Sequence, residues 1–246
     1  MSTHAETARE SPESSRQPAG AEFDAYEEGY DDALNKGLSV SGESKDYFAR
    51  ERVRWLEAVL AERGTRPRSV LDFGCGEGGS IPWFRAHLDP ERLVGVDVSA
   101  GLLRAAARQH ADSRATFTLS DTLAAEPAFD LAFCNGVFHH IPPAERTGAV
   151  DYVLRRLRPG GLFAFWENNP WNPGTRYVMS RIPFDRDAIT LSPPEAARLL
   201  ERGGFRVVRK DFCFFFPRLL AFLRPIERSL SKVPLGAQYL VLGEKT

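Results

Sequence analysis

Apolar residues along the middle of the chain recur with two alternating periods. Short, nearly continuous apolar runs predict buried strands, and longer stretches with apolar residues at every third or fourth position predict amphipathic helices. The strands are expected at residues 69–73, 93–97, 115–119, 129–135 and 162–167, and the helices at 80–87, 99–109 and 143–157. This alternation is typical of an α/β fold and predicts a Rossmann-like, doubly wound and mostly parallel sheet.

The C-terminal third departs from this alternation. A helix at 193–202 is followed by strand-like runs at 205–216 and 237–242, which raises the expected number of strands to seven. Between these strands, residues 217–234 have apolar residues at helical spacing around Pro225, so we expect a bent helical insertion with a net charge of +3. Its apolar face fits a cover over a pocket, a homodimer contact or a membrane surface, and its short, bent helix favours the first two.

The N-terminal part divides into two segments of different composition. Residues 1–22 contain no Val, Ile, Leu, Phe, Trp or Tyr, and we expect a disordered tail there. Residues 23–64 contain aromatic residues and glycines, followed by a helical period at 45–62 that Gly64 and Pro67 end. We therefore expect an N-terminal lid with its helix at 23–64 and one main domain at 65–246.

The composition excludes several classes of protein. A chain of 246 residues with 43% hydrophobic and 26% charged residues is typical of a globular protein with one large domain. The net charge of −1 and the lack of a basic extension argue against a nucleic-acid partner. No apolar run is long enough to span a bilayer, and the three cysteines lie far apart, without metal-ligand spacing. We expect a cytoplasmic protein with no membrane span and no metal site.

The stretch VLDFGCGEGGS at residues 70–80 holds the first functional signal. Gly74, Gly76 and Gly79 have the spacing of a glycine-rich turn between a strand and a helix, where a nucleotide cofactor approaches the backbone. A dinucleotide would put a pyrophosphate there, and the carboxylates of Asp72 and Glu77 would repel it. The same carboxylates suit S-adenosylmethionine, which carries an ammonium and a sulfonium. A nicotinamide-dependent oxidoreductase is the alternative for this loop.

Two further strand ends carry polar residues suited to an adenosine. Asp97 ends the second strand, where a carboxylate accepts hydrogen bonds from ribose hydroxyls in both NAD and S-adenosylmethionine sites. Asp121 and Thr122 follow the third strand, where we expect the adenine. The alternative role of Asp121 is to cap the next turn.

As a set, these segments resemble the class I S-adenosylmethionine-dependent methyltransferases, and among them the small-molecule enzymes grouped as type 11. The resemblance covers residues 45–167 and rests on VLDFGCGEGGS, VGVDVS, FDLAFCNGVFHHIPP and VLRRLRPGGLFAF. It implies an antiparallel last strand, an N-terminal lid, and S-adenosylmethionine as the cofactor, with S-adenosylhomocysteine as its product. The cofactor-binding residues that it implies are Asp72, Gly74, Cys75, Gly76, Asp97, Val98, Asp121, Thr122 and Asn135.

The same resemblance suggests individual roles. It implies that Asp72 lies near the methionine ammonium, directly or through water, and that Asn135 offers its backbone carbonyl to the same group. Gly74 and Gly76 would let the backbone pass under the methionine part. Cys75 holds a loop position where the family commonly has cysteine, so we do not expect it to act as a nucleophile.

The segments after the fourth and fifth strands are candidates for the acceptor side. His139 and His140 stand where the family's acceptor pocket meets the methyl group, and a histidine can take a proton from an acceptor. We expect His139 to be the catalytic base, with His140 as a second candidate and with capping or packing as the alternative role. The residues expected to bind the acceptor are Tyr30, Tyr47, Glu167, Asn168, Asn169, Trp171 and Arg176. We expect a stiff polar loop over residues 165–188, in which Arg176 and Arg181 contact an anionic acceptor or pair with local acids.

These patterns together predict methyl transfer from S-adenosylmethionine to a small molecule by in-line displacement, with O-methylation as the first choice. Two alternatives stay open at the acceptor: N- or C-methylation of a specialised metabolite, or of a lipid- or sugar-linked intermediate. A third alternative is a non-catalytic protein that binds the cofactor as a partner of another enzyme.

Overall fold

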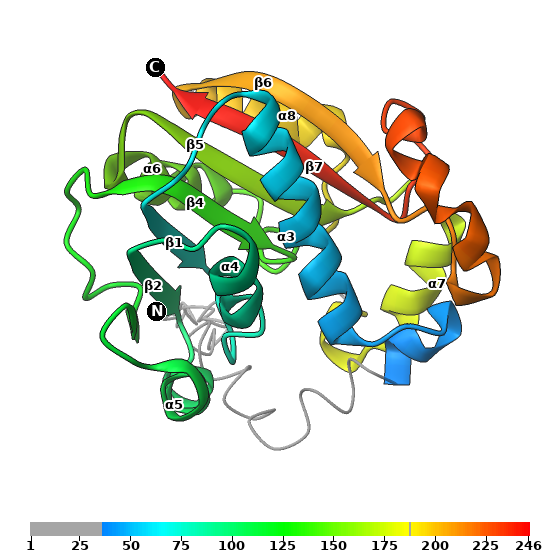
Figure 1. Cartoon of the computed structure of the whole chain (residues 1–246), viewed down its shortest axis with the longest axis horizontal. Coiled ribbons are helices and arrows are strands. Elements are labelled where there is room, and N and C mark those ends of the chain that lie inside the picture. Colours follow the sequence, from blue (N-terminus) through cyan, green and yellow to red (C-terminus); the bar gives the residue numbers. More distant parts are fainter. Residues whose placement is uncertain (1–35, 187) are drawn as a thin grey trace, which may run out of the picture.

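The computed structural model describes residues 36–186 and 188–246, and a seven-stranded sheet forms its centre (Figure 1). The strands are β1 (Ser69–Phe73), β2 (Arg92–Asp97), β3 (Ala115–Leu119), β4 (Phe129–Asn135), β5 (Leu157–Asn168), β6 (Phe205–Cys213) and β7 (Gln238–Lys245). The α-helices are α3 (Lys45–Glu62), α4 (Ile81–His87), α5 (Ala100–His110), α6 (Arg146–Arg156), α7 (Pro173–Arg181) and α8 (Pro193–Arg202). Short 3₁₀ helices are η1 (Ser39–Ser41), η2 (Pro183–Asp185) and η3 (Arg218–Leu230).

The strand order β3-β2-β1-β4-β5-β7-β6 confirms the Rossmann-like sheet that the sequence predicts. The first five strands pair in parallel, and β7 lies antiparallel between β5 and β6. The chain reverses its direction across the sheet between β1 and β4. Ligands of such sheets bind in the crevice beyond the carboxyl ends of the strands at this reversal.

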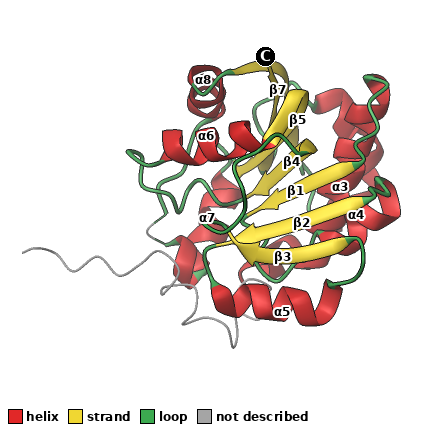
Figure 2. Cartoon of the chain, turned by 90° about the vertical axis from the view of Figure 1, so that its left-hand side faces the viewer, coloured by secondary structure: helices red, strands yellow, loops and turns green. Residues whose placement is uncertain are grey.

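Helices cover both faces of the sheet (Figure 2). On one face, α3 and α4 bury Leu56 and Phe84, and on the other, α6 and α8 bury Val153 and Leu200. Burial of each such side chain stabilises the fold by about 1.5–3 kcal/mol. The two cores hold the strands rigidly, so that the segments after each strand end have fixed positions.

Most expected elements lie where the sequence places them. The helices at 45–62 and 193–202 and the strands at 69–73, 115–119 and 129–135 have the expected bounds. Ser44 and Ser99 accept hydrogen bonds from the backbone amides of Tyr47 and Leu102, which explains the starts of α3 and α5. The expected tail at 1–22 and the lid residue Tyr30 lie outside the described residues.

The expectation of a stiff polar loop at 165–188 is wrong for its middle part, which forms α7. Asn172 and Pro173 suggested turns, but Asn172 caps the helix by accepting a hydrogen bond from the amide of Thr175 at 2.9 Å. Pro173 begins the helix, a position that tolerates the missing amide. The same residue types thus start a helix here, because Thr175 and Met179 bury one of its faces.

The insertion expected at 217–234 is present as η3, with 3₁₀ geometry and a break at Leu220 instead of one bent α-helix. Exposed apolar side chains gather on it, including Leu219 and Phe222. In the part of the chain that the structure describes, no helix combines the length and the apolar character needed to cross a bilayer. The first turns of α3, α7 and η3 lie near one another at one end of the molecule (Figure 1).

Candidate active site

A cavity of about 420 Å³ opens at the carboxyl ends of β4 and β5. Asn135 and Asn168 end these strands and line it, and His139 and His140 line it from the segment after β4. The segment before α3, the helix α7, η2 and the start of η3 complete the wall. Apolar lining residues include Leu38, Phe48, Val178, Met179, Phe184 and Phe215. The cavity therefore combines polar groups from the strand ends with an apolar wall from the peripheral elements.

The glycine loop between β1 and α4 is tight at one glycine and open at the next. Gly74 has φ +72°, and a Cβ there would lie 2.3 Å from a methyl carbon of Val137. Gly76 has φ +53°, and no described atom lies within 4 Å of the place where its Cβ would be. The loop therefore packs closely below Gly74 and leaves room for a ligand at Gly76.

Asp72 and Arg52 are two buried groups of opposite charge that act on each other near the carboxyl end of β1, and Arg52 lines the cavity. Burial raises the pKa of Asp72 to about 7, with a further rise from Asp97 and an opposing effect of Arg52. Burial lowers the pKa of Arg52 to about 10, although Asp72 opposes the shift. Arg52 Nη1 donates to Gln238 Oε1 at 2.9 Å, whereas its buried Nε has no hydrogen-bond partner among the described residues. Such a pair suits a ligand with both an ammonium and a carboxylate.

Sequence reasoning missed Arg52, although the sequence contains a signal for it. Arg52 lies on α3 within the apolar stripe formed by Ala49, Val53 and Leu56. A cation at a core position of an amphipathic helix is unusual, because an unpaired buried charge is costly. The position of Arg52 therefore indicates that a polar group lies beneath the helix.

Asp97 is held by backbone amides at the end of β2. Its carboxylate accepts from the amides of Gly76 at 2.9 Å and Ser99 at 3.0 Å. Val98 is exposed beside it. The arrangement links the glycine loop to the next strand end, where the ribose contact is predicted.

The third strand end lies apart from the cavity lining. Asp121 and Thr122 are exposed in the turn after β3. Thr122 Oγ1 donates to the carbonyl of Leu119 at 2.8 Å and lies 2.6 Å from Thr118 Oγ1. The predicted adenine contact of Asp121 and Thr122 stays a prediction.

Cys75 is buried inside the glycine loop. Burial, with the nearby carboxylates of Asp72 and Asp97, raises the pKa of its thiol well above the usual range. A protonated, buried thiol is a poor nucleophile. This agrees with a structural role for Cys75 in the loop.

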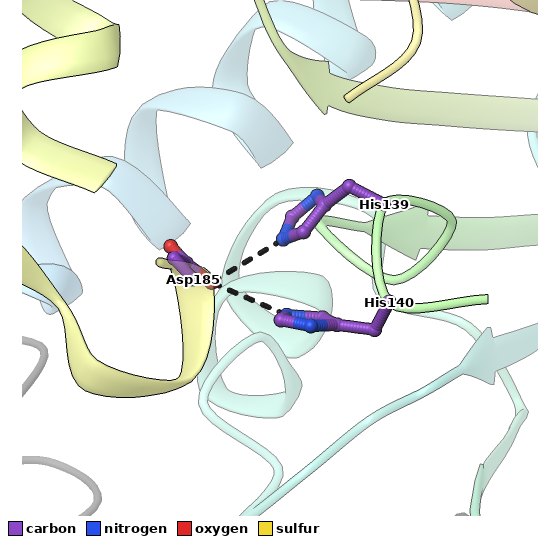
Figure 3. A group of neighbouring side chains, drawn as sticks. All are labelled: His139, His140 and Asp185. Atoms are coloured by element: carbon purple, nitrogen blue, oxygen red, sulfur yellow. Dashed lines mark ion pairs between the residues drawn. The ribbon is translucent and has the colours of Figure 1, made fainter. Parts of the chain in front are cut away.

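His139, His140 and Asp185 form a compact cluster on the wall of the cavity (Figure 3). His139 Nδ1 lies 2.6 Å from Glu167 Oε2, and its Nε2 lies 3.4 Å from Asp185 Oδ1. His140 Nε2 lies 3.2 Å from the same oxygen of Asp185. Burial favours neutral His139, but Glu167 and Asp185 outweigh it and raise the pKa of His139 to about 10.

Asp185 is the second functional residue that sequence reasoning missed. We considered it only as a turn residue, and it does lie in η2. Burial raises its pKa, but the two histidines outweigh this effect and lower it to about 2. A signal in the sequence was lacking, because Asp185 is far from His139 along the chain and only the fold brings them together.

The residues expected to bind the acceptor divide between the cavity and other places. Tyr47 and Asn168 line the cavity. Burial raises the pKa of the Tyr47 phenol to about 12, and the guanidinium of Arg224 lies 4.7 Å from its ring centre. Asn168 Oδ1 accepts from Gln238 Nε2 at 3.0 Å. These two residues are therefore placed to contact a bound molecule.

The other expected residues lie behind or outside the wall. Glu167 is buried behind His139, and Asn169 donates to the backbone carbonyls of Pro234 and Gly236. Trp171 and Arg176 are exposed and lie outside the cavity lining. The helical period of α7 turns Arg176 outward, because the neighbouring Thr175 faces the interior. Trp171 and Arg176 thus do not line the cavity, and their contact with the acceptor stays a prediction.

The comparisons with known proteins agree with this arrangement. A family model described as a methyltransferase domain matches residues 71–163. The chain is 31% identical over 162 residues to a trans-aconitate 2-methyltransferase of Methylobacterium nodulans, and the alignment covers 65% of this chain and 58% of that protein. The chain spans about half the length of the curated relatives that it matches.

Solved structures extend the similarity of the fold. An S-adenosylmethionine dependent methyltransferase from Mesorhizobium loti has a TM-score of 0.53 and 21% identity, covering 72% of this chain and 90% of that one. Magnesium protoporphyrin IX methyltransferase from Synechocystis PCC 6803, solved with bound SAH, has a TM-score of 0.57 and 16% identity, covering 86% of each chain. In the match of residues 71–163 to a methyltransferase domain and in its fold, the chain is similar to the class I S-adenosylmethionine-dependent methyltransferases.

Proposed function

We propose that this protein transfers the methyl group of S-adenosylmethionine to an oxygen atom of a small organic acid. The observation that carries the proposal is the cavity itself. Arg52, whose charge acts on the buried Asp72, lines it together with the polar cluster of His139 and His140. The zwitterionic end of the cofactor and the acceptor would thus lie in one enclosed space.

The cofactor side of the cavity fits S-adenosylmethionine on two features of this chain. Arg52 Nε is a buried donor without a described partner, and it would donate to the methionine carboxylate. The space at Gly76 lets a ligand approach the loop backbone, and Asp97 beside it would bind the ribose hydroxyls. When bound, the cofactor supplies an electrophilic methyl group on its sulfonium.

The protein's contribution would be mainly alignment and exclusion of water. An in-line displacement needs the acceptor oxygen, the methyl carbon and the sulfur held on one line. Phe48, Met179 and Phe184 form an apolar wall on three different elements, which restricts the positions that an acceptor can take. The predicted lid before α3 would close this space further.

A carboxylate is the acceptor group that we favour. Several of the relatives found by comparison are named for the methylation of trans-aconitate, which is an acid. Arg52 and Arg224 line the cavity, and a guanidinium can bind a second carboxylate of the acceptor. The apolar wall would contact the carbon skeleton.

The histidine base belongs to a second version of this proposal. A carboxylic acid loses its proton in water well below neutral pH, so methylation of a carboxylate requires no base. His139 and His140 would then orient the acceptor. If the acceptor is a hydroxyl, His139 is the base that we propose, although its pKa of about 10 means that it must first lose its own proton. The product distinguishes the two versions. N- and C-methylation stay alternatives that the same product analysis separates.

Location and assembly are further parts of the proposal. The three cysteines are free and buried, which supports a reducing, cytoplasmic setting. The exposed Leu219 and Phe222 of η3 are candidates for a homodimer contact.

The test is transfer of a labelled methyl group to a panel of small acids, alcohols and amines. We expect label in an acid, released by mild alkali because the product is a methyl ester, and no transfer by the Asp97→Ala variant. An alkali-stable product would replace the carboxylate by a hydroxyl, nitrogen or carbon acceptor. A full panel without transfer, in a protein that still binds S-adenosylhomocysteine, would favour the non-catalytic alternative.

A further inference from the structure

We infer that His139, His140 and Asp185 form a binding site for a divalent first-row transition-metal ion on the acceptor side of the cavity. The three side chains come from two segments, the turn after β4 and η2, which only the fold brings together (Figure 3). Each offers one ligand atom, and these atoms all lie within 4.8 Å of one another. Nothing in the spacing of these residues along the chain indicates such a site, and we expected no metal.

The separations between the ligand atoms match those around a bound ion. Zinc lies about 2.0–2.1 Å from imidazole nitrogen and carboxylate oxygen, so two ligands of one ion lie about 3.0–3.4 Å apart in octahedral or tetrahedral geometry. The two measured separations from Asp185 Oδ1 are 3.4 Å to His139 Nε2 and 3.2 Å to His140 Nε2. These two separations are compatible with one shared ion, and the two histidine ligand atoms lie within 4.8 Å of each other.

His139 Nε2 supplies an independent observation that a ligand is expected here. His139 is 3% exposed, and its Nε2 points toward Asp185, whose Oδ1 lies 3.4 Å away, with no closer hydrogen bond among the described residues (Figure 3). A buried polar atom that has only such a long contact is costly. A metal ion bound to Nε2 would give this atom a closer partner and would lie next to the carboxylate of Asp185.

Glu167 orients His139 for this role. An ionised carboxylate only accepts hydrogen bonds, so the 2.6 Å contact with Glu167 Oε2 requires His139 Nδ1 to donate. Glu167 is itself fixed, because its Oε1 accepts from the amide of Phe138 at 2.8 Å. Because Nδ1 donates to Glu167, Nε2 is the nitrogen that faces the metal position, and a metal ion that binds there displaces the Nε2 proton. A carboxylate behind a metal-binding histidine is a common arrangement in metalloproteins.

The ligand set also indicates which ions fit. Two imidazoles and one carboxylate favour ions such as Zn²⁺, Fe²⁺ or Co²⁺ over Mg²⁺ and Ca²⁺, which prefer oxygen ligands. All three residues line the cavity, so the open coordination positions would face it. An acceptor carboxylate or hydroxyl could bind there, and this last step alone rests on the proposed function.

The test is titration of the metal-free full-length protein with Zn²⁺ by calorimetry, and with Co²⁺ by visible absorption. We expect one ion per chain, visible Co²⁺ bands of a nitrogen- and oxygen-ligated site, and weaker binding of Mg²⁺. His140→Gln and Asp185→Asn should lower the Zn²⁺ affinity at least ~100-fold, and Glu167→Gln about 10–100-fold, because it removes only the orienting hydrogen bond.

The matched control is His87→Gln. His87 pairs with Glu57 at 3.0 Å on the outer surface of α4, far from the cavity lining, and this variant should bind Zn²⁺ like the original protein. Thermal unfolding of each variant checks that it is folded. Absence of saturable binding, or binding that is insensitive to both His140→Gln and Asp185→Asn, would overturn the inference. The assay contains neither cofactor nor acceptor, so failure here leaves the proposed methyl transfer standing, and the reverse also holds.

Discussion

The two sides of the cavity are built in different ways. The cofactor side consists of short segments that directly follow β1 and β2, and Gly76 and Asp97 meet there through one hydrogen bond of 2.9 Å. The acceptor side combines the turn after β4 with η2, α7 and residues 214–217. The first side follows from local sequence and the sheet, whereas the second depends on how peripheral elements pack. The difference explains why this sequence indicates a cofactor more readily than an acceptor.

The largest loss of cofactor affinity is expected from a substitution of Gly74, where the glycine loop packs most closely. Gly74→Ala forces a positive φ on a Cβ that would lie 2.3 Å from Val137. A combined strain of about 3 kcal/mol corresponds to roughly 100-fold weaker binding of S-adenosylhomocysteine, measured by calorimetry. Gly64→Ala is the control, because Gly64 also has a positive φ but has no described atom within 4 Å of its Cβ position. Equal affinities of the two variants would contradict the close packing at Gly74.

The next largest loss of cofactor affinity is expected from a substitution of Arg52, the buried cation of α3. Arg52→Met keeps the length of the side chain and removes the charge, so S-adenosylhomocysteine should bind about tenfold more weakly, with the loss of one charged hydrogen bond. Arg54→Met, on the exposed side of the same helix, should bind like the original protein. An unchanged affinity in Arg52→Met would remove this residue from the cofactor site.

A pH effect of similar or smaller size is expected from Asp72. Its pKa of about 7 in the free protein means that part of the population must lose a proton before the carboxylate can bind an ammonium. The affinity for S-adenosylhomocysteine should therefore fall about tenfold from pH 8 to pH 6. The Asp72→Asn variant should bind weakly and with a flatter pH profile over this range. The same slope in both proteins would assign the titration to another group.

The smallest effect is expected on the outer face of α7. Arg176 is exposed and lies outside the cavity lining, so Arg176→Met should change the KM for the acceptor by less than about twofold. Arg224→Met removes a cation that lines the cavity and should raise this KM about 5–10-fold. A large effect of Arg176→Met would restore the sequence-based expectation for this residue and show that the acceptor reaches beyond the cavity.

The sequence predicted the sheet because each strand is a short apolar run and each crossover helix has its own period. The predicted cofactor contacts of Asp72, Gly76 and Asp97 rest on the same reasoning, because these residues occupy fixed positions relative to strand ends, and they stay predictions. Asp185 was out of reach of this reasoning, because it acquires its partners only when η2 packs against the turn after β4. Arg52 was missed, although its place in the apolar stripe of α3 is a signal in the sequence.

The helix α7 illustrates a different limit. Asn172 and Pro173 favour turns and helix starts alike, and the choice depends on whether the following residues find a core to pack against. Here Thr175 and Met179 are buried in the cavity wall, and the segment forms a helix. The orientation of Arg176 follows from that packing, which a list of polar loop residues does not reveal.

The central claim is that the glycine loop binds S-adenosylmethionine and not a dinucleotide. The direct measurement is calorimetric titration of the full-length protein with S-adenosylhomocysteine and, separately, with NAD. We predict one bound S-adenosylhomocysteine per chain, at least ~10-fold weaker binding in Asp97→Ala, and no detectable binding of NAD. Tighter binding of NAD than of S-adenosylhomocysteine would contradict the account.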